Sequence, residues 1–164
     1  MTTHTVKLGD GAELTYHVDG QGPDVMLVSG LGGTAAFWAP IVAVLKDRYR
    51  LITADARGIA ASTRGAATVD IDRLSIDCFA ILDAVSSKRA AIIGHSTGGV
   101  IAQTMGLMQP GRISGLGLSG TWVKADRYMH GLFRSRLEVL RLAPQEYAVG
   151  TVFVGYPAGW LKDN

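Results

Sequence analysis

The stretch "GHSTGG", residues 94–99, follows the short apolar run "RAAII" and precedes the apolar-rich segment "VIAQTMGLM". A strand, a tight turn and a helix in this order fit the pattern G-x-S-x-G. Such a turn forces Ser96 into a strained conformation, and Gly94 and Gly98 lack the side chains that would collide there. Gly99 lets the helix pack close to the sheet. The serine hydroxyl should then project above the sheet, over the positive end of the helix.

An ordinary strand–helix turn, with Ser96 as the N-cap of the helix, is the alternative interpretation of the same pentapeptide. A second segment favours the catalytic interpretation. "VSGLGG", residues 28–33, also ends a predicted buried strand. Parallel strands bring their carboxyl ends to one edge of a sheet, so this loop can reach Ser96. We therefore predict the backbone N–H groups of Leu31 and Thr97 as oxyanion donors. A flexible turn is the alternative for the glycines.

The remaining pattern alternates strands with helices after an opening hairpin. Residues 4–8 and 13–20 alternate apolar and polar side chains around a Gly-containing turn, which predicts two antiparallel strands. Apolar runs predict further strands. Apolar residues at helical spacing after Asp70, a possible N-cap, predict the second of three helices. The sequence thus predicts a mostly parallel α/β sheet with an antiparallel N-terminal hairpin. The further strands are expected at 24–29, 49–55, 89–94 and 113–120, and the helices at 37–45, 69–85 and 98–108.

Composition narrows the class of protein. The chain has 164 residues, of which 48% are hydrophobic and 18% charged, as in a globular protein with a core. Its net charge of +2 is too small to indicate a nucleic-acid or membrane partner. The single cysteine, Cys78, lies in an apolar stretch and is predicted to be a buried structural thiol. The N-terminus has no apolar signal region, so we expect a cytoplasmic protein.

The chain resembles the α/β-hydrolase family. The resemblance is carried by "VSGLGGTAAFW", "DARGIAAS", "GHSTGG" and "PGRISGLGLSG", which follow the family's order over about the first 120 residues. Within the family it is similar to the small-substrate branch of enol-lactonases, esterases and aminoacrylate or carbamate hydrolases. The resemblance implies a serine hydrolase that acts on a small ester, lactone, amide or carbamate through an acyl-enzyme on Ser96. It implies no cofactor and no metal.

Two positions depart from the family's pattern. Ser29 stands where the family usually has histidine, which bears on the hydrogen bonds that anchor this loop. Ala60 stands where the family usually has glycine, and this change should stiffen the loop that contains it.

The resemblance also sets the expected domain organisation. Residues 1–121 are predicted to form the first part of the hydrolase core, and residues 122–164 the start of a helical cap. An amphipathic helix is predicted at 125–143, ended or bent by Pro144. The aromatic residues that follow are predicted to line the substrate pocket, with packing as the alternative. These residues are Tyr147, Phe153, Tyr156 and Trp160.

The acid and histidine of the family's Ser–acid–His triad are not found where the resemblance places them. Asp126 is the nearest acidic residue and a poor candidate. The histidines are His4, His17, His95 and His130, none at the expected position. We therefore expect a chain whose C-terminal part of the fold is absent and which alone is inactive. The missing part, or a second copy, would cover the edge strand at 113–120.

Two other classes of protein remain as alternatives. The segment "GLGGTA" fits a dinucleotide-binding domain that uses Gly30, Gly32, Ala35 and Asp55. The preceding hairpin and the bulky "FWAP" at the start of the following helix oppose this alternative. A non-catalytic hydrolase relative that binds a small molecule or a partner is the other alternative.

Overall fold

The computed structural model describes residues 2–155, 159 and 162. The chain divides into two compact units, residues 1–123 and residues 124–164. The first unit contains the sheet and the serine turn, and the second contains two helices.

The first unit is built on a mixed sheet. Within the described residues, six strands lie in the order β1-β2-β4-β3-β5-β6. β1 pairs with β2, and β2 with β4, in antiparallel orientation, whereas the pairs β4–β3, β3–β5 and β5–β6 are parallel. The predicted hairpin and the mostly parallel sheet are therefore confirmed. The strands are β1 (Thr2–Lys7), β2 (Glu13–Asp19), β3 (Asp24–Val28), β4 (Arg50–Ala54), β5 (Ala90–His95) and β6 (Ile113–Ser119).

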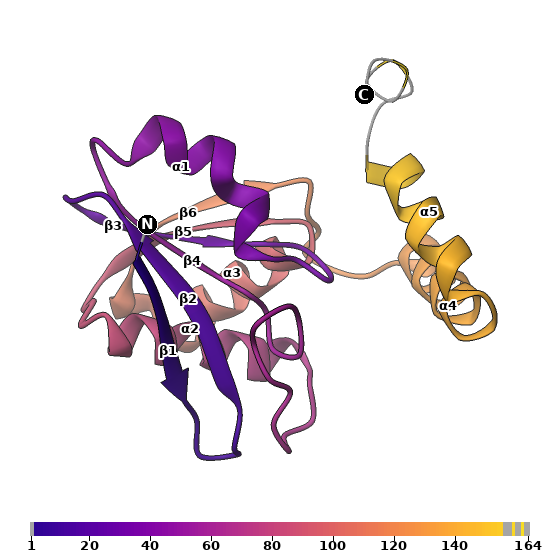
Figure 1. Ribbon diagram of the computed structural model, residues 1–164, viewed down its shortest axis with the longest axis horizontal. Helices are drawn as coiled ribbons and strands as arrows, with labels where there is room; N and C mark the ends of the chain where they lie inside the picture. Colours follow the sequence, from indigo (N-terminus) through magenta and orange to yellow (C-terminus); the bar gives the residue numbers. More distant parts are fainter. Residues whose placement is uncertain (1, 156–158, 160–161, 163–164) are drawn as a thin grey trace. The chain divides into compact units, whose positions relative to one another are not determined.

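Helices cover both faces of this sheet. α1 (Ala39–Leu45) lies on one face, and α2 (Ile71–Ala84) and α3 (Thr97–Met108) lie on the other (Figure 1). The predicted Asp70 cap is confirmed, because its Oδ1 accepts a 2.7 Å hydrogen bond from the Arg73 backbone N–H. The helix predicted from residue 37 is instead divided into a 3₁₀ turn, Ala35–Trp38, followed by α1. Another 3₁₀ turn, Pro110–Arg112, precedes β6.

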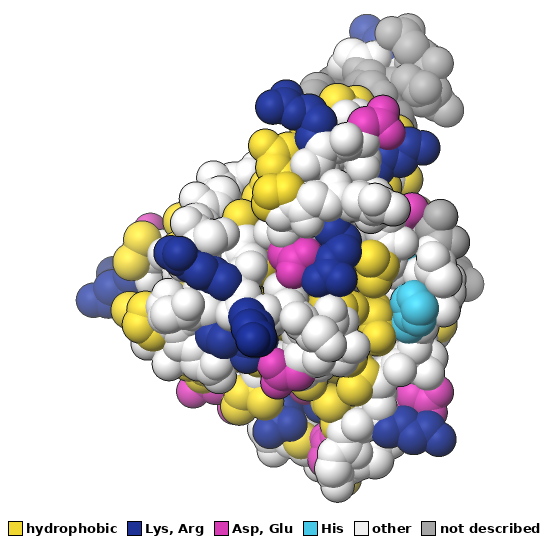
Figure 2. Space-filling view, turned by 90° about the vertical axis from the view of Figure 1, so that its left-hand side faces the viewer, with side chains coloured by type: hydrophobic (Ala, Val, Ile, Leu, Met, Phe, Trp, Pro, Cys, Tyr) yellow, Lys and Arg dark blue, Asp and Glu magenta, His cyan; other side chains and the backbone are white. Residues whose placement is uncertain are grey.

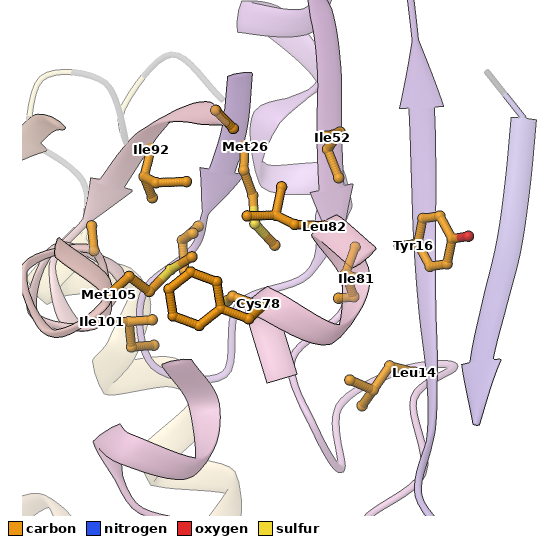
Figure 3. Close-up of a cluster of buried hydrophobic side chains, with 14 residues drawn as sticks. Leu14, Tyr16, Met26, Ile52, Cys78, Ile81, Leu82, Ile92, Ile101 and Met105 are labelled. Carbon is orange, nitrogen blue, oxygen red and sulfur yellow. The ribbon is translucent and has the colours of Figure 1, made fainter. Parts of the chain in front are cut away.

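The main hydrophobic core lies between the sheet and the pair α2 and α3. Figure 3 shows Ile81 and Leu82 of α2 and Ile101 and Met105 of α3 gathered against strand residues such as Met26. Full burial of each such side chain contributes about 1.5–3 kcal/mol. The helix that follows Ser96 is thus held rigidly by its apolar face. A smaller cluster packs beneath α1 and contains Val25, Leu27, Trp38 and Leu51.

The second unit is a helical hairpin formed by α4 (Arg127–Leu142) and α5 (Pro144–Gly155). α4 confirms the predicted amphipathic helix, and Asp126 caps it by accepting a 2.8 Å bond from the Met129 N–H. The Arg136 guanidinium lies 4.7 Å from the centre of the Tyr147 ring and donates to Thr151, which joins the two helices. The sequence did not predict α5.

Charged groups of both signs are interspersed over the face shown in Figure 2. This distribution agrees with the scattered Lys and Arg residues in the sequence. None of the helices in the described part of the chain has the length and apolar character needed to cross a bilayer.

Candidate active site

Ser96 lies at the turn between β5 and α3 with a strained backbone. Its φ of +54° and ψ of −122° fall where non-glycine residues are rare. It occupies the N-cap position, yet its side chain makes no capping hydrogen bond. The Ser96 hydroxyl therefore does not cap α3, although the residue stands at the N-cap position. The hydroxyl is left beside the first turn of α3, whose N–H groups have no partners within the helix.

The glycines around Ser96 are required by close backbone contacts. A Cβ on Gly94 would collide with the backbone of Gly98, and one on Gly98 would collide with the carbonyl of Val28. A Cβ on Gly99 would come within 2.5 Å of the Thr121 side chain. These contacts agree with the predicted role of the glycines, which is to let the helix start against the sheet.

The glycine loop, which lies within residues 28–33 after β3, reaches Ser96, as the sheet order requires. β3 and β5 are neighbours in the sheet. The strand after β3, which is β4, lies on one side of β3, and the next strand, β5, lies on the other. The carboxyl ends of β3 and β5 therefore flank the crevice where ligands bind in open α/β sheets. A Cβ built on Gly30 would lie 3.5 Å from Ser96 Oγ. Leu31, whose backbone N–H is a predicted oxyanion donor, follows directly. Thr97, the other predicted donor, is the first residue of α3.

The hydroxyl of Ser29 anchors this loop in place of the family's histidine. Ser29 Oγ donates a 3.0 Å hydrogen bond to the carbonyl of Thr34, which closes the loop on itself. The Gly33 N–H also donates to the Gly30 carbonyl at 2.9 Å. An anchoring hydrogen bond is therefore present, but it comes from a shorter side chain.

A second loop, residues 55–66, supports the first. Asp55 is buried, and its carboxylate accepts hydrogen bonds from the Ala35 N–H at 2.9 Å and the Ala61 N–H at 3.3 Å. This carboxylate therefore ties the end of the glycine loop to the second loop. Ala60 takes a φ of +47°, which glycine adopts more readily.

Arg57 crosslinks the second loop to the rest of the core. Its side chain is fully buried and makes two 2.7 Å hydrogen bonds to the carboxylate of Asp77 on α2. It also donates to Asp10 and, at 2.9 Å, to the Arg64 carbonyl. The bonds to Asp77 raise the pKa of Arg57 despite its burial. Burial opposes ionisation of Asp10, but the bonds from Arg57 and from the N–H groups of Ala12 and Ala67 lower its pKa.

A cavity of about 250 Å³ lies beneath the glycine loop. Gly30, Leu31 and Thr97 line it on the side of the serine turn, and Cys78 of α2 lines it deeper in the core. Cys78 is buried, as predicted, and desolvation raises the pKa of its thiol to about 12. Sequence reasoning missed this cavity, because its walls come from loops and helices far apart in the chain.

The histidines of the first unit do not bond to Ser96. His4 and His17 belong to β1 and β2. β2 lies three strand positions from β5, or about 14 Å at the usual strand spacing. The His95 ring stacks on Phe37, and its Nδ1 lies 3.3 Å from Ser119 Oγ. The described residues include no side chain that hydrogen-bonds to the Ser96 hydroxyl. His130 lies on α4 in the second unit.

The predicted pocket aromatics belong to the second unit or lie outside the described residues. Tyr147 on α5 is half-buried beneath Arg136, and Phe153 is 69% exposed. Tyr156 and Trp160 are outside the described residues. In the described segments, no group of three or more His, Cys, Asp or Glu side chains could hold a metal ion.

The dinucleotide-binding alternative is wrong. Its ribose-binding candidate, Asp55, uses both carboxylate oxygens on loop N–H groups. Its glycine-rich segment leads into a short 3₁₀ turn at Ala35 rather than directly into an α-helix. The third parallel strand, β5, pairs with β3 and not with β4, unlike the usual order of a dinucleotide fold.

Comparison with known proteins agrees with the resemblance to the α/β-hydrolase family. The sequence model described as the alpha/beta hydrolase fold matches residues 23–152. The chain belongs to the α/β-hydrolase family.

Relatives named "Putative carbamate hydrolase RutD" occur among the similar proteins. The one from Azorhizobium caulinodans is 31% identical over 95% of this chain, and the one from Variovorax paradoxus is 36% identical over 92%. The chain spans 59% of the length of each of these relatives.

Solved structures match the whole described fold. A hydrolase from Pseudomonas aeruginosa superposes with a TM-score of 0.88 at 29% identity, covering 98% of this chain and 61% of that one. An enol-lactonase from Burkholderia xenovorans gives 0.87 at 23% identity, with 98% and 62% covered, and this likeness concerns the fold.

Proposed function

We propose that Ser96 is the nucleophile of a serine hydrolase that acts on a small ester, lactone, amide or carbamate. The observation that carries the proposal is the strained, uncapped serine at the start of α3, with Gly30 directly beside its hydroxyl. Strain of this kind costs about 1–3 kcal/mol and persists where the surrounding structure fixes it. The names of the relatives and the neighbouring structures support the same reaction class.

In this reaction, Ser96 Oγ attacks the carbonyl carbon of the substrate while a base accepts the hydroxyl proton. The carbonyl electron pair moves to oxygen, and the N–H groups of Leu31 and Thr97 stabilise the resulting oxyanion. Collapse of this intermediate breaks the bond to the leaving group, which takes up the proton. Water then attacks the acyl-enzyme, and the same steps release the acid and free Ser96.

The base and its acid partner have no candidate bonded to Ser96 among the described residues. We place them, in this proposal, in the part of the relatives' length that the chain does not span. Residues 122–164 would then be the start of a helical cap, and residues 1–121 the first part of the core. The small-molecule substrate would bind at the glycine loop, beside the Ser96 hydroxyl.

A fluorophosphonate probe tests the nucleophile, because it reacts with activated serines. In the full-length protein, where the proposed base is present, we expect one adduct per chain, mapped to Ser96 by mass spectrometry and abolished in Ser96→Ala. Ser135→Ala, on the exposed surface of α4, is the matched control and should label normally. Equal labelling of Ser96→Ala and the unchanged chain would refute the proposal.

Steady-state ester hydrolysis by the 164-residue chain alone tests the missing base. Without a base, oxyanion stabilisation and binding leave a residual of about 10³–10⁴-fold over water. The 164-residue chain should therefore acylate slowly and not turn over at an enzymatic rate. Ordinary turnover that His130→Ala abolishes would instead assign the base to α4.

A further inference from the structure

We propose that Asp55 is a positioning residue for the reaction, because its buried carboxylate fixes the loop that carries the Leu31 N–H. The inference rests on the proposed function and adds to it the side chain that sets one of the two oxyanion donors. Asp55 directly follows β4, and only 8% of its surface is exposed. Its carboxylate bonds to backbone N–H groups, so it acts on the reaction through the glycine loop.

The direction of the Leu31 N–H depends on what holds the two ends of the glycine loop. The Leu31 side chain is 62% exposed, so it contributes little to the position of the loop. The neighbouring Gly30 and Gly32 have the freedom of glycine, and Gly32 takes a φ of +71°. One end of the loop is β3, which is fixed in the sheet between β4 and β5. The other end enters the 3₁₀ turn at Ala35.

Asp55 and its neighbour hold this second end. The Ala35 N–H donates a 2.9 Å hydrogen bond to Asp55 Oδ1. A hydrogen bond to a carboxylate is about twice as strong as one between neutral groups. The Ala56 N–H donates a longer bond, 3.4 Å, to the Gly33 carbonyl. The short bond to the carboxylate is therefore the stronger of these two connections between β4 and the glycine loop.

Asp55 is itself held firmly enough to serve as an anchor. Its backbone N–H donates to the Thr15 carbonyl of β2 at 3.0 Å, and its carbonyl accepts a 2.9 Å bond from Ser62 Oγ. Its second carboxylate oxygen accepts from the Ala61 N–H at 3.3 Å. Aspartate is the short side chain that offers an acceptor oxygen on each side, so it can bind both loops at once.

The two partners of the 2.9 Å bond can be changed separately. Asp55→Leu removes both acceptor oxygens and keeps a side chain in the site. Ala35→Pro removes the donor N–H and leaves the carboxylate in place. Proline fits there, because position 35 begins the 3₁₀ turn and Thr34 before it is extended, with φ of −107° and ψ of 164°. Ala35→Pro also covers the case that Asp55→Leu does not fold.

Acylation of the full-length protein by p-nitrophenyl acetate measures the effect. In each variant the maximal acylation rate should fall about 10- to 100-fold, because a donor misplaced by about 1 Å costs up to 10²-fold. The half-saturating ester concentration should change by less than about twofold, since the donor acts on the transition state. Asp55→Leu/Ala35→Pro should lose no more than the worse single variant, because both changes break the same bond.

Two further variants separate positioning from stability. Asp55→Asn keeps one acceptor oxygen, which can bind the Ala35 N–H while the Ala61 N–H loses its partner. It should lose stability but acylate within about threefold of the unchanged protein, because the bond to the glycine loop remains. Asp24→Asn is the matched control, because it weakens the ion pair with Arg50 at the opposite end of β3. It should lower Tm without slowing acylation.

The position of the loop can be measured without any reaction. In the 164-residue chain, the backbone amide NMR signals of Leu31 and Gly32 should shift, and their hydrogen exchange should quicken, in Asp55→Leu and in Ala35→Pro. The same signals should stay unchanged in Asp24→Asn.

The outcomes distinguish this inference from the proposed nucleophile. Unchanged acylation in both Asp55→Leu and Ala35→Pro overturns the role of Asp55 and leaves Ser96 as the nucleophile. An equal loss of acylation in Asp24→Asn also overturns it, because the loss would then follow from stability alone. Absence of fluorophosphonate labelling in the unchanged full-length protein overturns the nucleophile, and with it any role of Asp55 in the reaction.

Discussion

Replacement of Arg57 by alanine should destabilise the chain strongly. Arg57 is fully buried, and Asp77, its bidentate partner, has a side chain only 6% exposed. Removal of the guanidinium leaves the Asp77 carboxylate in the core with Arg73, 3.9 Å away, as its remaining cation. Breaking a buried pair in this way costs about 3–5 kcal/mol, because the buried carboxylate loses both of its short hydrogen bonds and its nearest positive charge.

The size of the effect makes it measurable by thermal and urea unfolding. For a chain of this length, 1 kcal/mol corresponds to about 2–4 °C, so Arg57→Ala should lower Tm by roughly 10 °C. The double variant Arg57→Met/Asp77→Leu removes both charges and keeps apolar volume. It should recover most of the lost stability, since buried ion pairs contribute little over apolar replacements.

Two results would contradict this reasoning. A loss below about 1 kcal/mol in Arg57→Ala would mean that the pair is solvated and worth no more than a surface ion pair. A double variant as unstable as the worse single variant would mean that packing of the Arg57 side chain, and not charge compensation, dominates.

Two further predictions concern the strained backbone of Ala60 and the ion pairs of Asp24 and Asp10. Ala60→Gly should raise the free energy of unfolding by about 0.5–1 kcal/mol in urea titrations, because relief of a left-handed alanine outweighs the added freedom of the unfolded chain; a loss of stability would contradict it. Hydrogen bonds from Arg50 lower the pKa of Asp24 below its ordinary value of 3.8. Hydrogen bonds from Arg57 help to lower the pKa of Asp10 below the same value. The contribution of these two carboxylates to the free energy of unfolding is complete above the unfolded pKa, and it disappears as the pH falls through the lowered folded pKa. Urea midpoints should therefore drop below about pH 4, and less so in Asp10→Asn.

The fold was largely predictable because its signals are local. Short apolar runs predicted the parallel strands, and Asp70 before an amphipathic stretch predicted the start of α2. α5 was missed because "AVGTVFVG" combines β-branched residues and glycines without an apolar face of helical period. Its helical form depends on packing against α4.

The site was predictable only in part. Ser96 and the glycines around it follow from steric rules that a pentapeptide displays. The pairing of Arg57 with Asp77 joins a loop to a helix twenty residues further along, and no spacing rule reports such a contact. One signal was present: Asp77 lies on the same face of α2 as Leu74, Cys78 and Ile81, where an acidic residue needs a buried partner.

The Arg57 network connects stability with the geometry of the glycine loop. Arg57 donates to the Arg64 carbonyl and so braces the second loop, and Asp55 in that loop holds the Ala35 N–H at the end of the glycine loop. Methionine at position 57 can restore apolar packing but not this brace. Arg57→Met/Asp77→Leu should therefore regain stability while Ser96 still reacts more slowly with fluorophosphonate. Recovery of both the Tm and the labelling rate would mean that the glycine loop keeps its position without Arg57, through Ser29 and Asp55 alone.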